Sequence, residues 1–215
     1  MTGKISSFLL TITLMLTGTL TAQIQQPSYP FTRDFKPGLI FLHDGTQKSG
    51  LIKWFAAQEE KLIFRENEKA PKQKFPPEEL AGFQIDSFRF RSISGFDVYG
   101  NDFALLGKMS EIKHTFGQLL DSGKVNVYLV YYSGYNALGG SMQSYENILL
   151  ERKKDSGNVY SAYPVDIRMR DKKFEKVKDN LLSFFRDYPE IAEKIKTLQQ
   201  QNGLAEILNQ VKKLN

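Results

Sequence analysis

The sequence predicts an α+β protein: a mainly antiparallel β sheet or partly closed barrel with one internal helix, followed by two or three C-terminal helices. Short apolar runs separated by turn residues fill residues 38–165, which is typical of strands joined by hairpins. Residues 171–215 instead place apolar residues at helical spacing. The chain contains no cysteine, so packing of these elements, and not disulfides, has to stabilise the fold.

Residues 1–22 have the organisation of a secretory signal peptide. Lys4 gives a positive start, residues 5–20 are apolar but diluted by Ser, Thr and Gly, and the small Ala22 precedes Gln23. This order of charge, apolar core and small residue is the pattern that signal peptidases cut, and the apolar run is shorter than the ~20 residues of a membrane span. We therefore expect export, cleavage near Ala22-Gln23, and a mature protein in the periplasm or outside the cell. Residues 23–37 are polar and contain prolines, so they form an extended lead-in.

The first part of the β-rich region predicts two pairs of strands. Residues 38–43 and 50–55 are apolar runs on either side of the Asp44-Gly45 turn signal, so they predict a hairpin. Residues 61–65 predict a third strand, and residues 72–75 are a candidate partner for it.

A single helical turn and a further strand are expected next. Residues 76–80 begin with two prolines and continue with two acids, which suits the first turn of a helix. Residues 82–93 predict a strand in which the apolar positions change parity, so a bulge or bend is expected near Asp86-Ser87. Trp54 shares its parity with Ile52, and we expect this single tryptophan to be buried.

The middle of the chain predicts the internal helix and then three strands. Residues 112–120 place four apolar side chains on one helical face: Ile112, Phe116, Leu119 and Leu120. Residues 125–132 predict a strand rich in Val and Tyr, and residues 133–144, with three glycines, predict a loop. Residues 148–153 and 159–163 predict a hairpin.

The last 45 residues or so predict helices with one apolar face each. The apolar stripes are Phe174, Val177, Leu181 and Phe185; then Ile191, Ile195 and Leu198; then Leu204, Ile207, Leu208 and Val211. Pro189 suits the first turn of the second helix, and Asn202-Gly203 ends it. Amphipathic helices of this length need a partner surface, so we expect them to pack on the sheet, on one another or on a partner.

Charge and residue types argue against several functions. The 29 basic and 24 acidic residues are well mixed, whereas nucleic-acid binders concentrate positive charge on one face. The alternating Phe88-Arg89-Phe90-Arg91 is interpreted as a half-buried strand with Phe inward, not as a nucleic-acid-binding strand. His43 and His114 lie at no metal-ligand spacing, and thiolate ligands are absent. We expect no nucleic acid, no metal and no cofactor.

Carboxylates and tyrosines are the remaining candidates for a site. Glu59-Glu60, Glu78-Glu79 and Asp86 could serve a hydrolase only if two of them faced each other across a cleft, and solvated surface acids explain them more simply. No catalytic residue is therefore assigned. Tyr135 and Tyr145 lie in or beside the expected glycine-rich loop, and tyrosine suits contacts with sugars and proteins, so these two residues are the candidate binding residues.

Five short segments carry a resemblance to a known group of proteins. They are Leu20-Thr21-Ala22-Gln23, the glycines and turn of residues 38–52, Pro77-Glu78-Glu79-Leu80-Ala81-Gly82-Phe83, Gly123-Lys124-Val125-Asn126-Val127-Tyr128, and Asp187-Tyr188-Pro189-Glu190. In these segments the chain resembles uncharacterised exported proteins common in Bacteroidota. The resemblance implies export and assigns no activity, and no catalytic residue is carried over from it.

The leading interpretation is an exported, non-enzymatic protein that binds a protein or a surface polymer of the cell envelope. The alternative is a carboxylate-dependent hydrolase that acts on envelope glycan or peptide. Two facing acids in a deep pocket favour the hydrolase, whereas a shallow aromatic patch favours binding.

Overall fold

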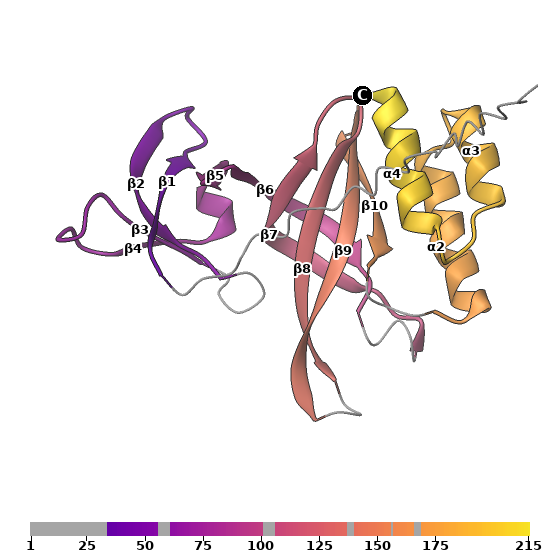
Figure 1. The fold of residues 1–215 in the computed structure, drawn as a ribbon, viewed down its shortest axis with the longest axis horizontal. Coiled ribbons are helices and arrows are strands. Elements are labelled where there is room, and N and C mark those ends of the chain that lie inside the picture. Colours follow the sequence, from indigo (N-terminus) through magenta and orange to yellow (C-terminus); the bar gives the residue numbers. More distant parts are fainter. Residues whose placement is uncertain (1–33, 56–60, 101–105, 137–139, 156, 166–168) are drawn as a thin grey trace, which may run out of the picture.

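The structure, a computed structural model, shows one antiparallel sheet followed by helices (Figure 1). It describes residues 34–55, 61–100, 106–136, 140–155, 157–165 and 169–215. In this part of the chain ten strands follow the order β10-β9-β8-β7-β6-β5-β1-β2-β3-β4. The α+β class with a mainly antiparallel sheet is confirmed, and the sheet is not closed, because β10 and β4 are its two ends. The expected signal peptide lies outside the described residues, as does nearly all of the lead-in.

The first five strands and a single helical turn come from the N-terminal half. They are β1 (Lys36–Phe41), β2 (Gln47–Lys53), β3 (Leu62–Arg65), β4 (Gln73–Phe75), the 3-10 turn η1 (Pro77–Glu79) and β5 (Gly82–Ile85). The ladders β1–β2 and β3–β4 are antiparallel. Both predicted strand pairs and the predicted helical turn are therefore confirmed.

The second half supplies five longer strands and three helices. They are β6 (Phe88–Val98), β7 (Ser110–Asp121), β8 (Asn126–Asn136), β9 (Ser141–Lys154), β10 (Gly157–Pro164), α2 (Asp171–Phe184), α3 (Pro189–Lys196) and α4 (Gly203–Leu214). The predicted β9–β10 hairpin and the C-terminal helices, three in number, are confirmed. Within the described residues, none of the helices has the length and apolar character needed to cross a membrane.

The predicted bulge or bend near Asp86-Ser87 is wrong. The apolar positions change parity there because the chain reverses direction between two separate strands, β5 and β6. β5 and β6 pair across this two-residue turn, with Phe83 opposite Phe90 and Ile85 opposite Phe88. Asp86 has φ 52, a left-handed conformation that Asp tolerates better than most residues. Residues directly opposite each other share a face, so the turn explains the parity without an extra residue.

The predicted helix over residues 112–120 is wrong, because this segment is strand β7. Ile112 lies opposite Phe96, and Phe116 lies opposite Ser92. A spacing of four residues repeats on one face of a strand as well as of a helix, so it could not separate the two. The register shifts between Leu119 and Asp121 in the ladder with β8, and this irregularity produces the apparent helical spacing at the end of the segment.

The predicted loop over residues 133–144 is wrong as well. β8 continues to Asn136 and β9 begins at Ser141, so most of this segment extends the β8–β9 ladder, and residues 137–139 lie outside the described part. The ring of Tyr132 packs against that of Tyr145 across the two strands, with centroids 6.3 Å apart. Cross-strand pairs of this kind stabilise a ladder in spite of the glycines.

Trp54 lies at the centre of the first of two cores. It is 4% exposed, and its ring meets those of Phe83, Phe90 and Phe116 edge-on at centroid distances of 5.2, 4.9 and 6.0 Å. The predicted burial of Trp54 is confirmed. Phe90 is buried while Arg89 and Arg91 are exposed, which agrees with the interpretation of residues 88–91 as a half-buried strand with Phe inward.

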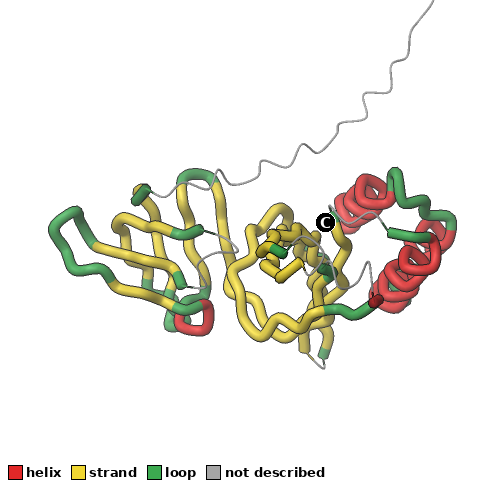
Figure 2. The backbone as a smooth tube through the Cα atoms, turned by 90° about the horizontal axis from the view of Figure 1, so that it is seen from below, coloured by secondary structure: helices red, strands yellow, loops and turns green. Residues whose placement is uncertain are grey.

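The second core lies inside the curled half of the sheet. Figure 2 shows the strands in the middle of the molecule curling into a rounded cross-section with the helices on one side. Phe96 on β6 meets Tyr160 on β10 at a centroid distance of 5.4 Å. β6 therefore contributes to both cores, because Phe90 contacts Trp54 and Phe96 contacts Tyr160.

Candidate functional site

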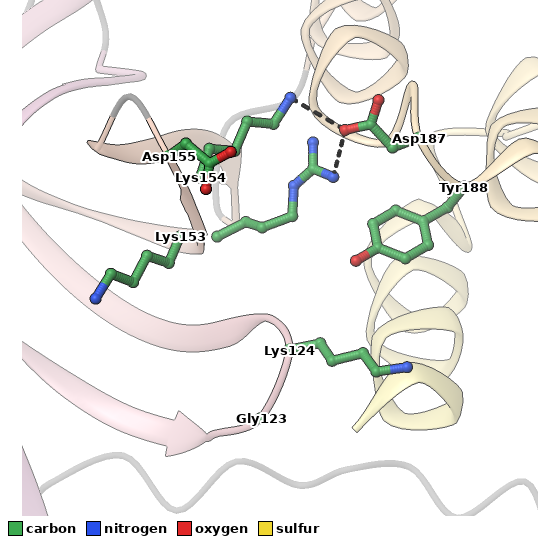
Figure 3. Close-up of a pocket in the computed structure, with 8 residues that line it drawn as sticks. Gly123, Lys124, Lys153, Lys154, Asp155, Asp187 and Tyr188 are labelled. Carbon is green, nitrogen blue, oxygen red and sulfur yellow. Dashed lines mark hydrogen bonds and ion pairs between the residues drawn. The ribbon is translucent and has the colours of Figure 1, made fainter.

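An open pocket of about 560 Å³ lies where the β7–β8 turn, the end of β9 and the α2–α3 connection meet (Figure 3). The residues that line it are Gly123, Lys124, Arg152, Lys153, Lys154, Asp155, Asp187 and Tyr188. Without Lys153, whose ammonium points away, the lining has three cations, Lys124, Arg152 and Lys154, against two carboxylates, Asp155 and Asp187. The lining therefore has an excess of one positive charge. The pocket can therefore attract an anion.

Arg152 is held firmly at the wall of this pocket. Its side chain is 7% exposed, Nη1 donates to Asp187 Oδ2 at 2.8 Å, and Nη2 donates to the Phe184 carbonyl at 2.6 Å. The guanidinium lies 5.4 Å from the Phe184 ring centre and 5.2 Å from that of Tyr188. Stacking and a planar set of donors suit arginine for oxyanion recognition.

Asp187 joins Arg152 to Lys154 through one oxygen. Lys154 Nζ lies 3.1 Å from the Oδ2 atom that also accepts from Arg152. The Asp187 side chain is 53% exposed, so it sits at the mouth of the pocket. Hydrogen bonds from Lys154 and then from Arg152 hold the pKa of the Asp187 carboxyl below its usual 3.8. These donors thus already bind one carboxylate of the chain itself.

Removing the Lys154 ammonium is expected to raise the pKa of Asp187 back toward 3.8. Because folding lowers this pKa, the ion pair stabilises the fold above the unfolded-state pKa, and that contribution is lost as the pH falls through the folded-state pKa. Carbon-13 NMR titration of the Asp187 carboxyl in wild type and Lys154→Gln measures the change. Lys153→Gln serves as the matched control and leaves the midpoint in place. A midpoint that is equal in wild type and Lys154→Gln would contradict the assignment.

The remaining side chains that line the pocket do not all point into it. In Figure 3 the Tyr188 hydroxyl points into the middle of the pocket, with Lys154 above it and Lys124 below. The Lys153 ammonium points away, as alternation along β9 requires for the neighbour of two pocket-facing residues. The buried Nε of Arg152 has no hydrogen-bond partner among the described residues.

The β7–β8 turn at the pocket is fixed by the end of α4. Asn215 accepts a hydrogen bond from the Val125 N–H at 3.1 Å and donates to the Val125 carbonyl at 2.9 Å and to Asp121 at 3.2 Å. A side chain at Gly123 would meet the Asn215 side chain. The turn therefore presents Lys124 from a supported position.

Glu151, next to Arg152 in the chain, belongs to a separate polar cluster on the opposite face of β9. Tyr128 and Asn126 donate to its Oε2 at 2.7 and 2.8 Å, and Asn158 and Tyr160 donate to its Oε1 at 2.8 and 3.0 Å. Burial, and then this carboxylate, raise the pKa of Tyr128. A carboxylate with four donors is well satisfied, so Glu151 is a structural group.

The two tyrosines predicted as binding residues lie on the β8–β9 ladder, away from the pocket. Tyr145 is buried, and its hydroxyl donates to Gln143 Oε1 at 2.9 Å. The backbone of Tyr135 pairs with Met142, and its side chain lies outside the described part. Their role in binding stays a prediction.

The other residues considered from the sequence do not converge. His43 Nε2 donates to the Glu78 carbonyl at 3.0 Å, and His114 is exposed on β7. Glu78 and Glu79 are exposed in η1, and Glu59-Glu60 lies outside the described residues. Within the described part, no group of three His, Asp or Glu side chains could hold a metal ion.

Comparison of the chain with models of protein families, with curated proteins and with solved structures gives no significant match. The site therefore has to be interpreted from its own geometry.

Proposed function

We propose that this chain is an exported, non-enzymatic protein that binds a negatively charged protein or polymer of the cell envelope. The observation that carries the proposal is Arg152: a buried cation held in one orientation at the wall of a pocket with excess positive charge. Preorganised donors of this kind lose little freedom when an oxyanion binds. The signal-like residues 1–22 support export.

The lowered pKa of the Asp187 carboxyl favours a binding function over a hydrolase. A carboxylate-dependent hydrolase needs one carboxyl with a raised pKa to act as a general acid. The pKa of Asp187 is lowered instead, and Glu151 lies on the other face of β9 with four donors around it. The hydrolase alternative gains no support from these carboxylates.

Binding of charged and neutral dextrans tests the proposal. Fluorescence anisotropy of the mature protein, residues 23–215, is measured with labelled dextran sulfate, carboxymethyl-dextran and neutral dextran. We expect binding to the two anionic polymers, weakened by salt because the contacts are ionic. Lys124→Gln is expected to weaken it about fivefold, the factor for ~1 kcal/mol from one charge pair in water.

Lys153→Gln is the matched control, because it removes the same charge from a side chain that points away from the pocket. A smaller loss than in Lys124→Gln supports the pocket as the site. Equal losses in both variants would mean that general charge, and not this pocket, binds the polymer. Equal binding of neutral dextran, or tighter binding of a single-stranded oligonucleotide, would overturn the proposal.

A further inference from the structure

We propose that the pocket receives a phosphomonoester group, such as that of a phosphorylated sugar, and that Asp187 occupies the phosphate position until the ligand displaces it. The inference rests on the proposed function and names the chemistry of its ligand. It depends on how differently Arg152 and Asp187 are held.

Arg152 has contacts that hold it in place without Asp187, whereas the Asp187 side chain can rotate away. Arg152 is also bonded to the Phe184 carbonyl and packed beside two rings, so losing Asp187 does not release it. Asp187, in contrast, is half exposed and follows the end of α2. Rotation of its side chain toward water leaves Arg152 Nη1 and Lys154 Nζ directed at one point, where a single oxygen now accepts from both.

Competition with Asp187 favours phosphate over carboxylate. A ligand carboxylate would have to displace the Asp187 carboxylate, which has the same charge. Because Asp187 is tethered beside the donors, its effective concentration is in the mM range. A phosphomonoester carries about −1.5 to −2 charges at pH 7 and three acceptor oxygens. It can accept from Arg152 and Lys154 through different oxygens and direct a third oxygen toward the Tyr188 hydroxyl, which points into the same space.

The size of the pocket is consistent with a small substituent on the phosphate. Small-molecule sites commonly have volumes of ~300–1,000 Å³, and this pocket has about 560 Å³. A phosphorylated sugar is therefore a suitable probe, with glucuronate as the matched sugar that carries a carboxylate instead.

Isothermal titration calorimetry of the mature protein tests the inference with glucose 6-phosphate, glucuronate and inorganic phosphate. We expect glucose 6-phosphate to bind more tightly than glucuronate. Its affinity is expected to rise between pH 5 and pH 7.5, as the phosphate loses its second proton near pH ~6, while that of glucuronate changes little. Asp187→Asn is expected to strengthen glucose 6-phosphate binding at least about fivefold, because the competing charge is gone.

Asp155→Asn is the matched control, because it removes the same charge from the same pocket lining. Asp187, and not Asp155, is the residue that bridges Arg152 and Lys154. Circular dichroism melts verify that both variants are folded. A clearly larger gain in Asp187→Asn supports displacement, whereas equal gains in the two variants, or a loss in folded Asp187→Asn, would overturn it. Inorganic phosphate that binds as tightly as glucose 6-phosphate would support the phosphate position and make free phosphate the ligand.

Two further outcomes separate this inference from the proposed function. Glucuronate binding as tightly as glucose 6-phosphate would overturn the phosphate assignment in favour of an acidic carboxylate ligand. No binding of any of the three probes, together with pocket-dependent binding of anionic dextran, would overturn the inference and leave the proposed function standing. Failure of the dextran experiment as well would reject both.

Discussion

Replacing Trp54 by alanine is expected to lower the free energy of unfolding by about 3–5 kcal/mol, the range for large core aromatics. The indole fills the space between Phe83, Phe90 and Phe116, which come from three different strands. Its removal leaves a cavity that these rings, fixed on their strands, can close only in part. Urea unfolding followed by far-UV circular dichroism measures the loss without depending on tryptophan fluorescence.

Met142→Ala is a suitable control for Trp54→Ala, because Met142 is 65% exposed and surface substitutions usually change stability by less than about 0.5 kcal/mol. A loss below about 1 kcal/mol in Trp54→Ala would mean that the aromatic cluster is not formed as described.

Leu181→Asp is expected to destabilise the protein by more than about 4 kcal/mol or to prevent folding. Leu181 is fully buried on α2, and losing a buried leucine side chain alone costs ~2–5 kcal/mol. An unpaired carboxylate buried in its place adds a large desolvation cost. Thermal unfolding followed by circular dichroism, with expression level as a second measure, tests the effect.

Ser183→Asp introduces the same charge on the exposed face of the same helix, and we expect it to leave the melting temperature almost unchanged. This pair of variants decides where the helices dock. If Leu181→Asp melted like wild type, the apolar face of α2 would not pack within the chain in solution and would be free for a partner instead.

The hairpins and the C-terminal helices could be predicted because their signals are local. Asp44-Gly45, the turn after Lys154 and the stripe around Leu181 each depend on residues close together in the chain. Residues 112–120 could not be assigned in the same way, because Ile112 and Phe116 fit one face of either element. Residues 112–120 form a strand because they pair with β6 and β8. These pairings are not visible in the spacing of the apolar residues.

The pocket was missed for a related reason. Arg152 lies on β9 and Asp187 follows α2, 35 residues later, so their meeting depends on how α2 packs on the sheet. The sequence did contain one signal, namely the run of charged residues 151–155 that follows the apolar residues 148–150 of the predicted strand. Alternation along β9 assigns Arg152 and Lys154 to the face opposite Lys153, but it cannot tell that helices cover that face.

The two cores share strand β6, and this affects the expected cooperativity of unfolding. Phe90 and Phe116 complete the cluster around Trp54, and Phe96 on the same strand as Phe90 reaches Tyr160 inside the curled half. A backbone cut before β6 would separate Trp54 from Phe90 and Phe116, and a cut after β7 would separate Phe96 from Tyr160. Neither cut leaves both fragments with their own interior complete. We therefore expect the two halves of the sheet to unfold together, so that a substitution at Trp54 also destabilises the strands that carry the pocket.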